Sequence, residues 1–222
     1  MGYSLSWIAV QRRPADGIKE FFGLKNTGKY GQYGKHKLVG RELDDGWYLL
    51  IANRCDDKII RDENLAKLSG GCQVVACSIE EHVMFSSSAL WKDGKKIWSV
   101  RHNGEEDHSD ITEQGILPAS YSVLKNQAIA EQKVESNEDM RVDHLFDLPL
   151  LLAKQLVGFK HDEALPKIPQ DSYEVFEDGN RPGFVHRITT SPWRWRIIGP
   201  VIFFGFWSIV AILIILVISK VF

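Results

Sequence analysis

The 222-residue sequence lacks a marked excess of either charge, because 27 Lys and Arg stand against 29 Asp and Glu, for a formal net charge of −2. This balance excludes a basic nucleic-acid binder and an acidic tail protein. A disordered chain is excluded as well, since 44% of the residues are hydrophobic. The composition is that of an ordinary folded protein, and no nucleic-acid partner is expected.

Cysteine is scarce, with Cys55, Cys72 and Cys77 as the only three. An odd number, with no secretory signal ahead of it, indicates reduced thiols. Cys72 and Cys77 do not have the spacing of a zinc site and lie in or beside an apolar run, so we expect them to be buried and inert. Cys55 lies in a polar turn beside Arg54, which makes it a weak candidate nucleophile.

The motifs of several common active sites are also missing. Residues 86–88 are three serines without the GxSxG elbow that exposes a nucleophile, and residues 25–37 contain glycines but no GxxxxGK[ST] phosphate loop. No zinc-binding or calcium-loop spacing is present. The sequence therefore predicts no cofactor, no bound metal and no small-molecule substrate, and it does not name a reaction.

A long hydrophobic run is present. Residues 197–219 are 23 residues without a charge, IIGPVIFFGFWSIVAILIILVIS. At ~1.5 Å of rise per residue, a helix of this length reaches ~34 Å. The hydrocarbon core of a bilayer is ~30 Å thick. The run is apolar on all sides, whereas a helix on the surface of a soluble protein keeps a polar stripe. The run therefore predicts a transmembrane helix embedded in a lipid bilayer.

Residues suited to a membrane interface flank this run, namely Arg187, Trp193, Arg194, Trp195, Arg196 and Lys220. The excess of arginine before the run places that side in the cytoplasm by the positive-inside rule. We therefore expect a single-pass, tail-anchored protein of an inner or plasma membrane, with its N-terminal domain in the cytoplasm. Gly205, Ser208 and Ala211 share one face of the helix, against which a second helix could pack.

Residues 1–160 are predicted to form a soluble α+β domain. Strands are expected over residues 3–10, 47–52, 72–79, 83–90, 96–102 and 142–146, and helices over residues 14–22, 62–68, 118–134 and 149–158. Asp93-Gly94 between two strand-like runs predicts a hairpin, and hence a mixed or antiparallel sheet. Residues 161–196 are rich in proline and charge and are predicted to be a juxtamembrane tether.

Two polar clusters are candidate sites. Residues 80–82 (Glu-Glu-His) follow a predicted strand, and a carboxylate beside an imidazole can perform acid–base chemistry. Residues 102–108 contain two histidines and three acidic residues, a set that can bind a divalent ion. Both clusters also fit a solvated surface. If they converge in one pocket, the candidate catalytic residues are Glu80, His82, His102 and Cys55.

The glycine-rich segment over residues 25–34 is predicted to be an exposed, flexible loop. Its lysines and tyrosines, with Lys35 and Lys37 nearby, are of the kind that contact anionic headgroups or a protein.

Three stretches resemble a bacterial family of uncharacterised proteins. They are residues 2–10 (GYSLSWIAV), 46–53 (GWYLLIAN) and 74–100 (VVACSIEEHVMFSSSALWKDGKKIWSV). The resemblance covers roughly residues 2–160 and implies a bacterial source. It implies no activity and assigns no catalytic residue.

Two functions fit these features. The first is a membrane-tethered interaction protein, either an accessory subunit or an immunity-type binder, whose protein partner is unidentified; tethering raises the effective concentration of such a contact. The second is a membrane-attached enzyme with a Glu/His or Cys site. Convergence of the four candidate residues would favour the enzyme, and their dispersal favours the interaction protein, which is the preferred hypothesis.

Overall fold

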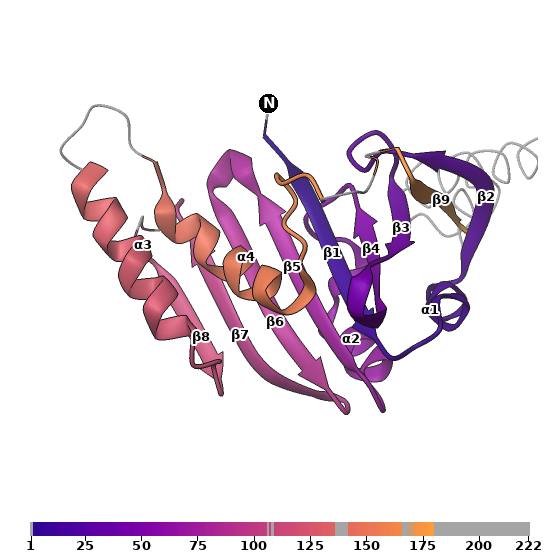
Figure 1. Cartoon of the computed structure of the whole chain (residues 1–222), viewed down its shortest axis with the longest axis horizontal. Helices are drawn as coiled ribbons and strands as arrows, with labels where there is room; N and C mark the ends of the chain where they lie inside the picture. The colour runs from indigo at the N-terminus through magenta and orange to yellow at the C-terminus, as the bar shows by residue number, and fades with distance from the viewer. Residues whose placement is uncertain are drawn as a thin grey trace, which may run out of the picture. The chain divides into compact units, whose positions relative to one another are not determined.

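A computed structural model describes residues 2–105, 107, 109–135, 142–165, 169 and 171–179, and these form an α+β domain around one antiparallel sheet (Figure 1). The sheet has nine strands in the order β2-β9-β3-β4-β1-β5-β6-β7-β8. In chain order they are β1 (Ser4–Gln11), β2 (Leu24–Gly31), β3 (Leu38–Glu42), β4 (Trp47–Ala52), β5 (Gln73–Glu80), β6 (Phe85–Lys92), β7 (Lys95–Asn103), β8 (Ile111–Gly115) and β9 (Tyr173–Asp178). The predicted α+β class is confirmed, with every strand pair antiparallel.

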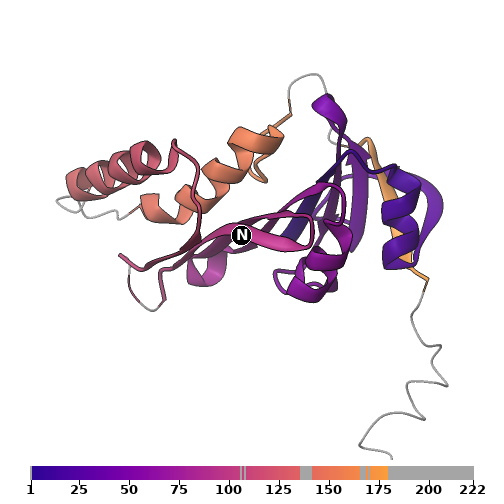
Figure 2. The same ribbon diagram turned by 90° about the horizontal axis from the view of Figure 1, so that it is seen from below.

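Helices cover the two faces of the sheet unequally (Figures 1 and 2). They are α1 (Ala15–Phe22), α2 (Asp62–Leu68), α3 (Tyr121–Glu135) and α4 (His144–Val157), with short 3₁₀ turns at Asp44–Gly46, Lys58–Ile60 and Glu81–Val83. Helix α4 packs over the middle of one face and α3 lies beside it, towards β8. Helices α1 and α2 lie on the opposite face, near β1, β4 and β5.

The central strand β1 supplies both cores, because successive side chains of a strand point to opposite faces. Trp7 packs with Leu150 of α4 on one face. Ile8 packs with Ile18 of α1 and Leu65 of α2 on the other. A strand buried on both faces explains why the sequence of β1, like that of β4, contains a near-continuous apolar run.

The last strand of the described region, β9, corrects the predicted domain boundary. It pairs with both β2 and β3 and buries Tyr173, Val175 and Phe176. The compact unit extends to Gly179, so the boundary at residue 160 is too early and residues 173–178 are not a tether. Alternating acidic residues and nearby prolines conceal this strand in the sequence.

Two further element predictions are wrong. Most of strand β2 lies in the segment predicted as a flexible loop, and the pairing of β2 with β9 shifts register between Asn26 and Tyr30. The short strand predicted over residues 142–146 is instead the beginning of α4, where the Asp143 carboxylate caps the helix by accepting a hydrogen bond from Phe146 N–H (3.2 Å). Pro149 lies inside this helix rather than at its start.

The predicted membrane segment falls outside the described residues. Among the helices that are described, none combines the length and the apolar character needed to cross a bilayer. Residues 197–219, with the packing face Gly205, Ser208 and Ala211, are not among them. The same is true of the predicted interface residues Arg187, Trp193, Arg194, Trp195, Arg196 and Lys220.

Candidate functional site

The candidate catalytic residues are divided between the two faces of the sheet. His102 of β7 lies on the α4 side, because its register partner Ser86 donates a hydrogen bond to the Phe146 carbonyl of α4 (2.6 Å). Glu80 of β5 is the partner of Ser4 in β1, on the side that carries α1 and α2. Since the sheet separates the two groups, these residues do not form one acid–base site.

His102 is completely buried and joins three parts of the fold. Its Nδ1 lies 2.7 Å from the Asp110 carbonyl oxygen and its Nε2 lies 2.9 Å from Asp143 Oδ2. The same Asp143 side chain caps α4. The imidazole therefore ties β7 to the segment before β8 and to the start of α4, which is a structural role.

The electrostatic surroundings of His102 favour its charged form. Burial by itself lowers the pKa of the imidazole, but the hydrogen bonds to Asp143 and to the Asp110 carbonyl outweigh burial and raise the pKa above its ordinary value. Both ring nitrogens face an acceptor, so a doubly protonated imidazolium satisfies both contacts.

Glu80 and Cys55 lie close together on the other face. Ser4 Oγ donates to Glu80 Oε2 (2.5 Å), and Cys55 Sγ lies 3.1 Å from Ser78 Oγ. Burial raises the pKa of the Cys55 thiol, and the charge of Glu80 adds to the effect. The thiolate is thus disfavoured, which is the opposite of what an activated nucleophile requires.

His82 does not share a strand face with Glu80, because β5 ends at Glu80 and residues 81–83 form a 3₁₀ turn. His82 is exposed on this turn. Its neighbour Glu81 instead accepts hydrogen bonds from Tyr3 N–H (2.7 Å) and contacts His161 Nε2 (3.0 Å). The turn therefore secures the start of β1 and the segment after α4.

A buried ionic cluster that the sequence does not predict lies directly after α4. The Lys160 ammonium, with a side chain only 5% exposed, pairs with Asp147 (3.0 Å) and Asp162 (2.6 Å). Burial lowers the pKa of Lys160, but the two carboxylates outweigh this and raise it. The Lys-His-Asp run over residues 160–162 lies at the predicted boundary between domain and tether, and its charged residues give no indication of burial in the sequence.

The acidic cluster over residues 102–108 does not form a metal site from the residues that are described. Within those ranges, no group of three or more His, Cys, Asp or Glu side chains is arranged to hold an ion. Glu106 and His108 lie outside the described residues. Asp107 and Glu105 lie in the turn after β7, while His102 is committed to Asp143 and Asp110.

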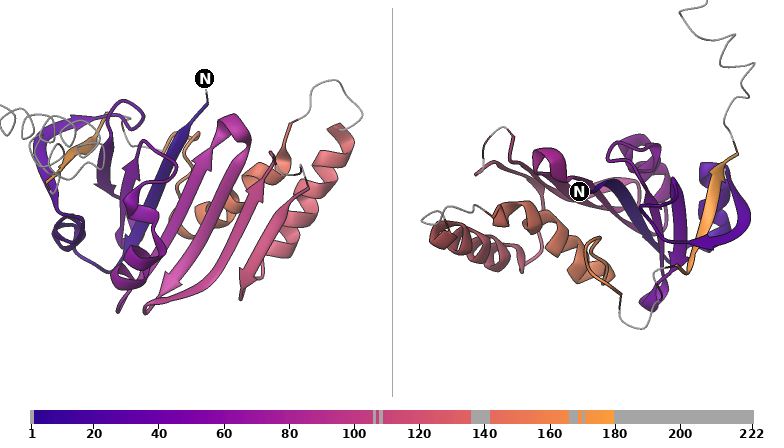
Figure 3. Two further views of the ribbon diagram at one scale, coloured as in Figure 1. Left: turned by 180° about the vertical axis from the view of Figure 1, so that it is seen from behind. Right: turned by 90° about the horizontal axis from the view of Figure 1, so that it is seen from above.

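A different site lies on the part of the sheet that no described helix covers (Figure 3). On strands β6 to β8, the side opposite α3 and α4 is open, and we call it the open face. It is hollowed into a pocket of about 360 Å³. The side chains that define the open face are Ser87, Ala89 and Trp91 of β6, Lys96, Ser99 and Arg101 of β7, and Thr112 and Gln114 of β8.

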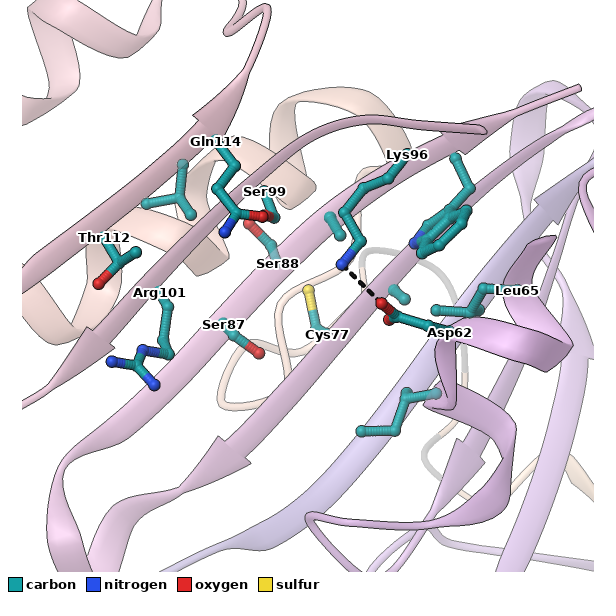
Figure 4. Close-up of a pocket in the computed structure, with 15 residues that line it drawn as sticks. Asp62, Leu65, Cys77, Ser87, Ser88, Lys96, Ser99, Arg101, Thr112 and Gln114 are labelled. Atoms are coloured by element: carbon teal, nitrogen blue, oxygen red, sulfur yellow. Dashed lines mark hydrogen bonds and ion pairs between the residues drawn. The ribbon is translucent and has the colours of Figure 1, made fainter. Parts of the chain in front are cut away.

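Small side chains create this hollow. Ser99 and Gln114 are register partners, and their side chains form a hydrogen bond (3.3 Å) across the floor (Figure 4). Ser87 and Thr112 flank Arg101, which is itself 4.0 Å from Asp110. Hydroxyl, amide and guanidinium groups thus line the surface, and Ala89 leaves its centre open.

An ion pair closes one end of the hollow. Lys96 Nζ donates to Asp62 Oδ2 of α2 (2.9 Å) and lies 5.1 Å from the centre of the Trp91 ring (Figure 4). Trp91 is only 5% exposed, and its indole N–H has no hydrogen-bond partner within the part of the chain that is described. A buried donor left unpaired costs ~1–3 kcal/mol of stability.

No protein-family model, curated protein or solved structure matches this chain. The resemblance to a bacterial family therefore remains an expectation.

Proposed function

We propose that this chain is a membrane-anchored interaction protein whose domain binds a protein partner through the open face. The observation that carries the proposal is the hollow of about 360 Å³ on a sheet surface without a covering helix. Of the side chains that define the open face, only Trp91 and Ala89 take part in an apolar core of the described domain. Its polar side chains, among them Ser99, Thr112 and Gln114, belong to none of the cores, so this surface can make a contact without disturbing the packing of the domain.

The chemistry of the open face suits binding better than catalysis. Its polar groups are hydroxyls, an amide and a guanidinium, which are suited to hydrogen bonds with a protein surface. Arginine, here the exposed Arg101, is one of the residue types that most often dominate the energy of such contacts. The Glu/His or Cys enzyme is the weaker candidate, because His102 and Glu80 lie on opposite faces and the pKa of Cys55 is raised.

Membrane attachment is supported by residues 197–219, which are uncharged and long enough to cross a bilayer. The single-pass, tail-anchored topology at an inner or plasma membrane, with a cytoplasmic domain, stays a prediction. Anchoring would confine the open face to a thin layer beside the bilayer and so raise its effective concentration for a membrane-resident partner.

Membrane attachment is testable by extraction. We expect the full chain to remain in the membrane pellet after an alkaline carbonate wash. A variant with Val210→Arg and Leu213→Arg should be released, because charges at the centre of a spanning helix are strongly disfavoured. Immunoblotting of pellet and supernatant provides the measurement, with Ile116→Arg in the domain as the control. Release of the unaltered chain would contradict the anchor.

The open face is testable by photo-crosslinking of the full chain in its native membrane. A photoreactive amino acid at Thr112 is expected to give a discrete protein adduct, and the added substitution Ser99→Arg should abolish it by filling the hollow. The matched change Ser122→Arg, on the exposed side of α3, should leave the adduct intact. Ser122→Arg should shift stability by less than about 0.5 kcal/mol, as is usual at the surface. An adduct that persists in the Ser99→Arg variant would rule out the open face.

A further inference from the structure

The edge of the sheet farthest from the open face carries a concentration of positive charge. Residues 25–37 read KNTGKYGQYGKHK and contain no acidic residue. Four lysines of this segment are exposed, and no ion pair engages them among the described residues; they are Lys25, Lys29, Lys35 and Lys37. We call these four lysines, with Tyr30, the basic edge.

The neighbouring strand does little to neutralise this charge. Glu174 of β9 is already engaged by Lys19 (2.9 Å) and by the Asn26 amide (3.2 Å). Glu177 lies opposite Lys25 in the register, which leaves Lys29, Lys35 and Lys37 as the lysines without an acidic register partner. Unpaired lysines exposed on one edge produce a local positive potential.

Tyr30 belongs to the same surface. Its side chain is 70% exposed, although tyrosine carries a large apolar ring. A ring with a hydroxyl at its end is suited to the headgroup region of a bilayer, where one end is apolar and the other is hydrated. Tyr30 therefore adds an interfacial anchor to the four cations.

The basic edge is held in a defined conformation. Tyr33 OH donates to the His161 carbonyl (2.6 Å), and the Asn53 amide donates to the Gly34 carbonyl (3.0 Å). The His36 ring packs so closely on Gly31 that a Cβ there would lie 2.2 Å from Nε2. The turn between β2 and β3 thus presents its lysines on a fixed scaffold, which lowers the entropic cost of binding.

The path of the chain brings the basic edge within reach of the predicted bilayer. Strand β2 pairs with β9, and the chain leaves the domain at Gly179, whose N–H donates to the Gly23 carbonyl (2.9 Å). The 17 residues from 180 to 196 separate this point from the hydrophobic run. Even fully extended, they span at most ~60 Å. The open face lies on the opposite end of the sheet, several strand spacings of ~4.8 Å away.

We propose that the basic edge binds the anionic phospholipid headgroups of the membrane that holds residues 197–219. This inference rests on the proposed membrane attachment. An acidic protein or a nucleic acid would also be attracted to these lysines. The bilayer is favoured because the chain itself connects this edge to the proposed membrane segment. Binding here directs the β2 end of the sheet to the membrane and the open face away from it.

The test uses the full chain in lipid nanodiscs of phosphatidylcholine alone or with added phosphatidylglycerol. Lysine acetylation by a small reagent is followed residue by residue with mass spectrometry. In anionic discs we expect acetylation of all four lysines of the basic edge, Lys25 included, to slow by roughly fivefold, the factor that corresponds to one lysine at an anionic surface. High salt should restore the rate, because the interaction is screened.

Three exposed lysines on other parts of the domain are internal controls, namely Lys67, Lys92 and Lys95. Their acetylation rates should be the same in both kinds of disc. The triple variant Lys29→Gln, Lys35→Gln, Lys37→Gln should lose the slower labelling at Lys25, whereas Lys67→Gln, Lys92→Gln, Lys95→Gln, with the same change in charge, should keep it.

Equal labelling of the basic edge in neutral and anionic discs would overturn the proposal, as would equal slowing at the control lysines. Failure of the membrane attachment itself would give a different result, because the chain would then not be incorporated into neutral phosphatidylcholine discs. The two outcomes are therefore distinguishable in one series of samples.

Discussion

A chain truncated after Leu165 is expected to be unfolded, whereas a chain truncated after Gly179 is expected to fold. The difference is β9, which buries Tyr173, Val175 and Phe176. Burial of each such side chain contributes about 1.5–3 kcal/mol. Loss of β9 also separates β2 from β3 and leaves both without a pairing partner on that side. The total approaches the 5–15 kcal/mol that stabilises a typical domain. Circular dichroism and urea unfolding of the two truncated chains provide the measurement.

A point variant tests the same strand in the full chain. Phe176→Ala should lower the free energy of unfolding by about 3–5 kcal/mol, as is typical for a buried phenylalanine. Glu177→Ala, next to it on the exposed side, should change it by less than about 0.5 kcal/mol. A cooperative unfolding transition in the chain that ends after Leu165 would show that β9 is dispensable.

Removal of the carboxylate in Asp143→Ala is expected to destabilise the domain by about 3–5 kcal/mol, the usual cost of breaking a buried pair by deleting one partner. The His102 imidazole, completely buried, would then lose its partner at Nε2, and α4 would lose its N-cap. Chemical denaturation of the domain in the full chain at slightly acid pH measures the loss. The exposed His82→Ala variant is the control and should be near neutral.

The contribution of His102 should also depend on pH. The folded pKa of His102 is raised above the value of about 6.5 in the unfolded chain. The charged imidazole therefore stabilises the fold fully below that value, and this contribution is lost as the pH rises through the folded pKa. The difference in unfolding free energy between the unaltered chain and Asp143→Ala should shrink over that interval. A constant difference from acid to alkaline pH would contradict a charged His102–Asp143 pair.

The parts of the fold that could be predicted from the sequence are those specified locally. The apolar runs of β1, β4 and β5 are long enough to predict strands without knowledge of their partners. The hairpin of β6 and β7 follows from Asp93-Gly94, because both residues adopt the positive φ angles (50° and 78°) that a tight two-residue turn requires. Helix α1 ends at Gly23, which takes the left-handed conformation expected of a C-terminal cap.

The parts that could not be predicted are determined by distant partners. Strand β9 is stabilised by β2 and β3, which precede it by well over a hundred residues, and its own sequence carries three acidic side chains. Helix α4 begins at Asp143 because a capping carboxylate stabilises the helix start, and Pro149 does not prevent helix formation in this apolar setting. Local sequence patterns do not show whether distant strand pairing or helix capping will outweigh the effect of acidic residues or of a proline.

The candidate site was equally dependent on tertiary structure. Periodicity alone indicates that Ser87 and Ser99 alternate with buried neighbours, but not which face of the sheet the helices cover. The same limitation applies to His102, whose burial depends on α4. The open face exists because α3 and α4 both pack on one side of β6 to β8, a choice that the sequence of those strands does not reveal.

The insertion of β9 between β2 and β3 has a consequence for biosynthesis. A ribosome makes β2 and β3 early, yet the sheet between them cannot close until residue 178 has been released from the exit tunnel. Until then, β2 and β3 of the nascent chain each have a strand edge whose backbone N–H and C=O groups are unpaired. Such edges promote association with other chains. The hydrophobic run begins only 19 residues after Asp178. If that run enters a membrane as proposed, the domain would complete its folding at nearly the same moment at which the run would have to be shielded from water.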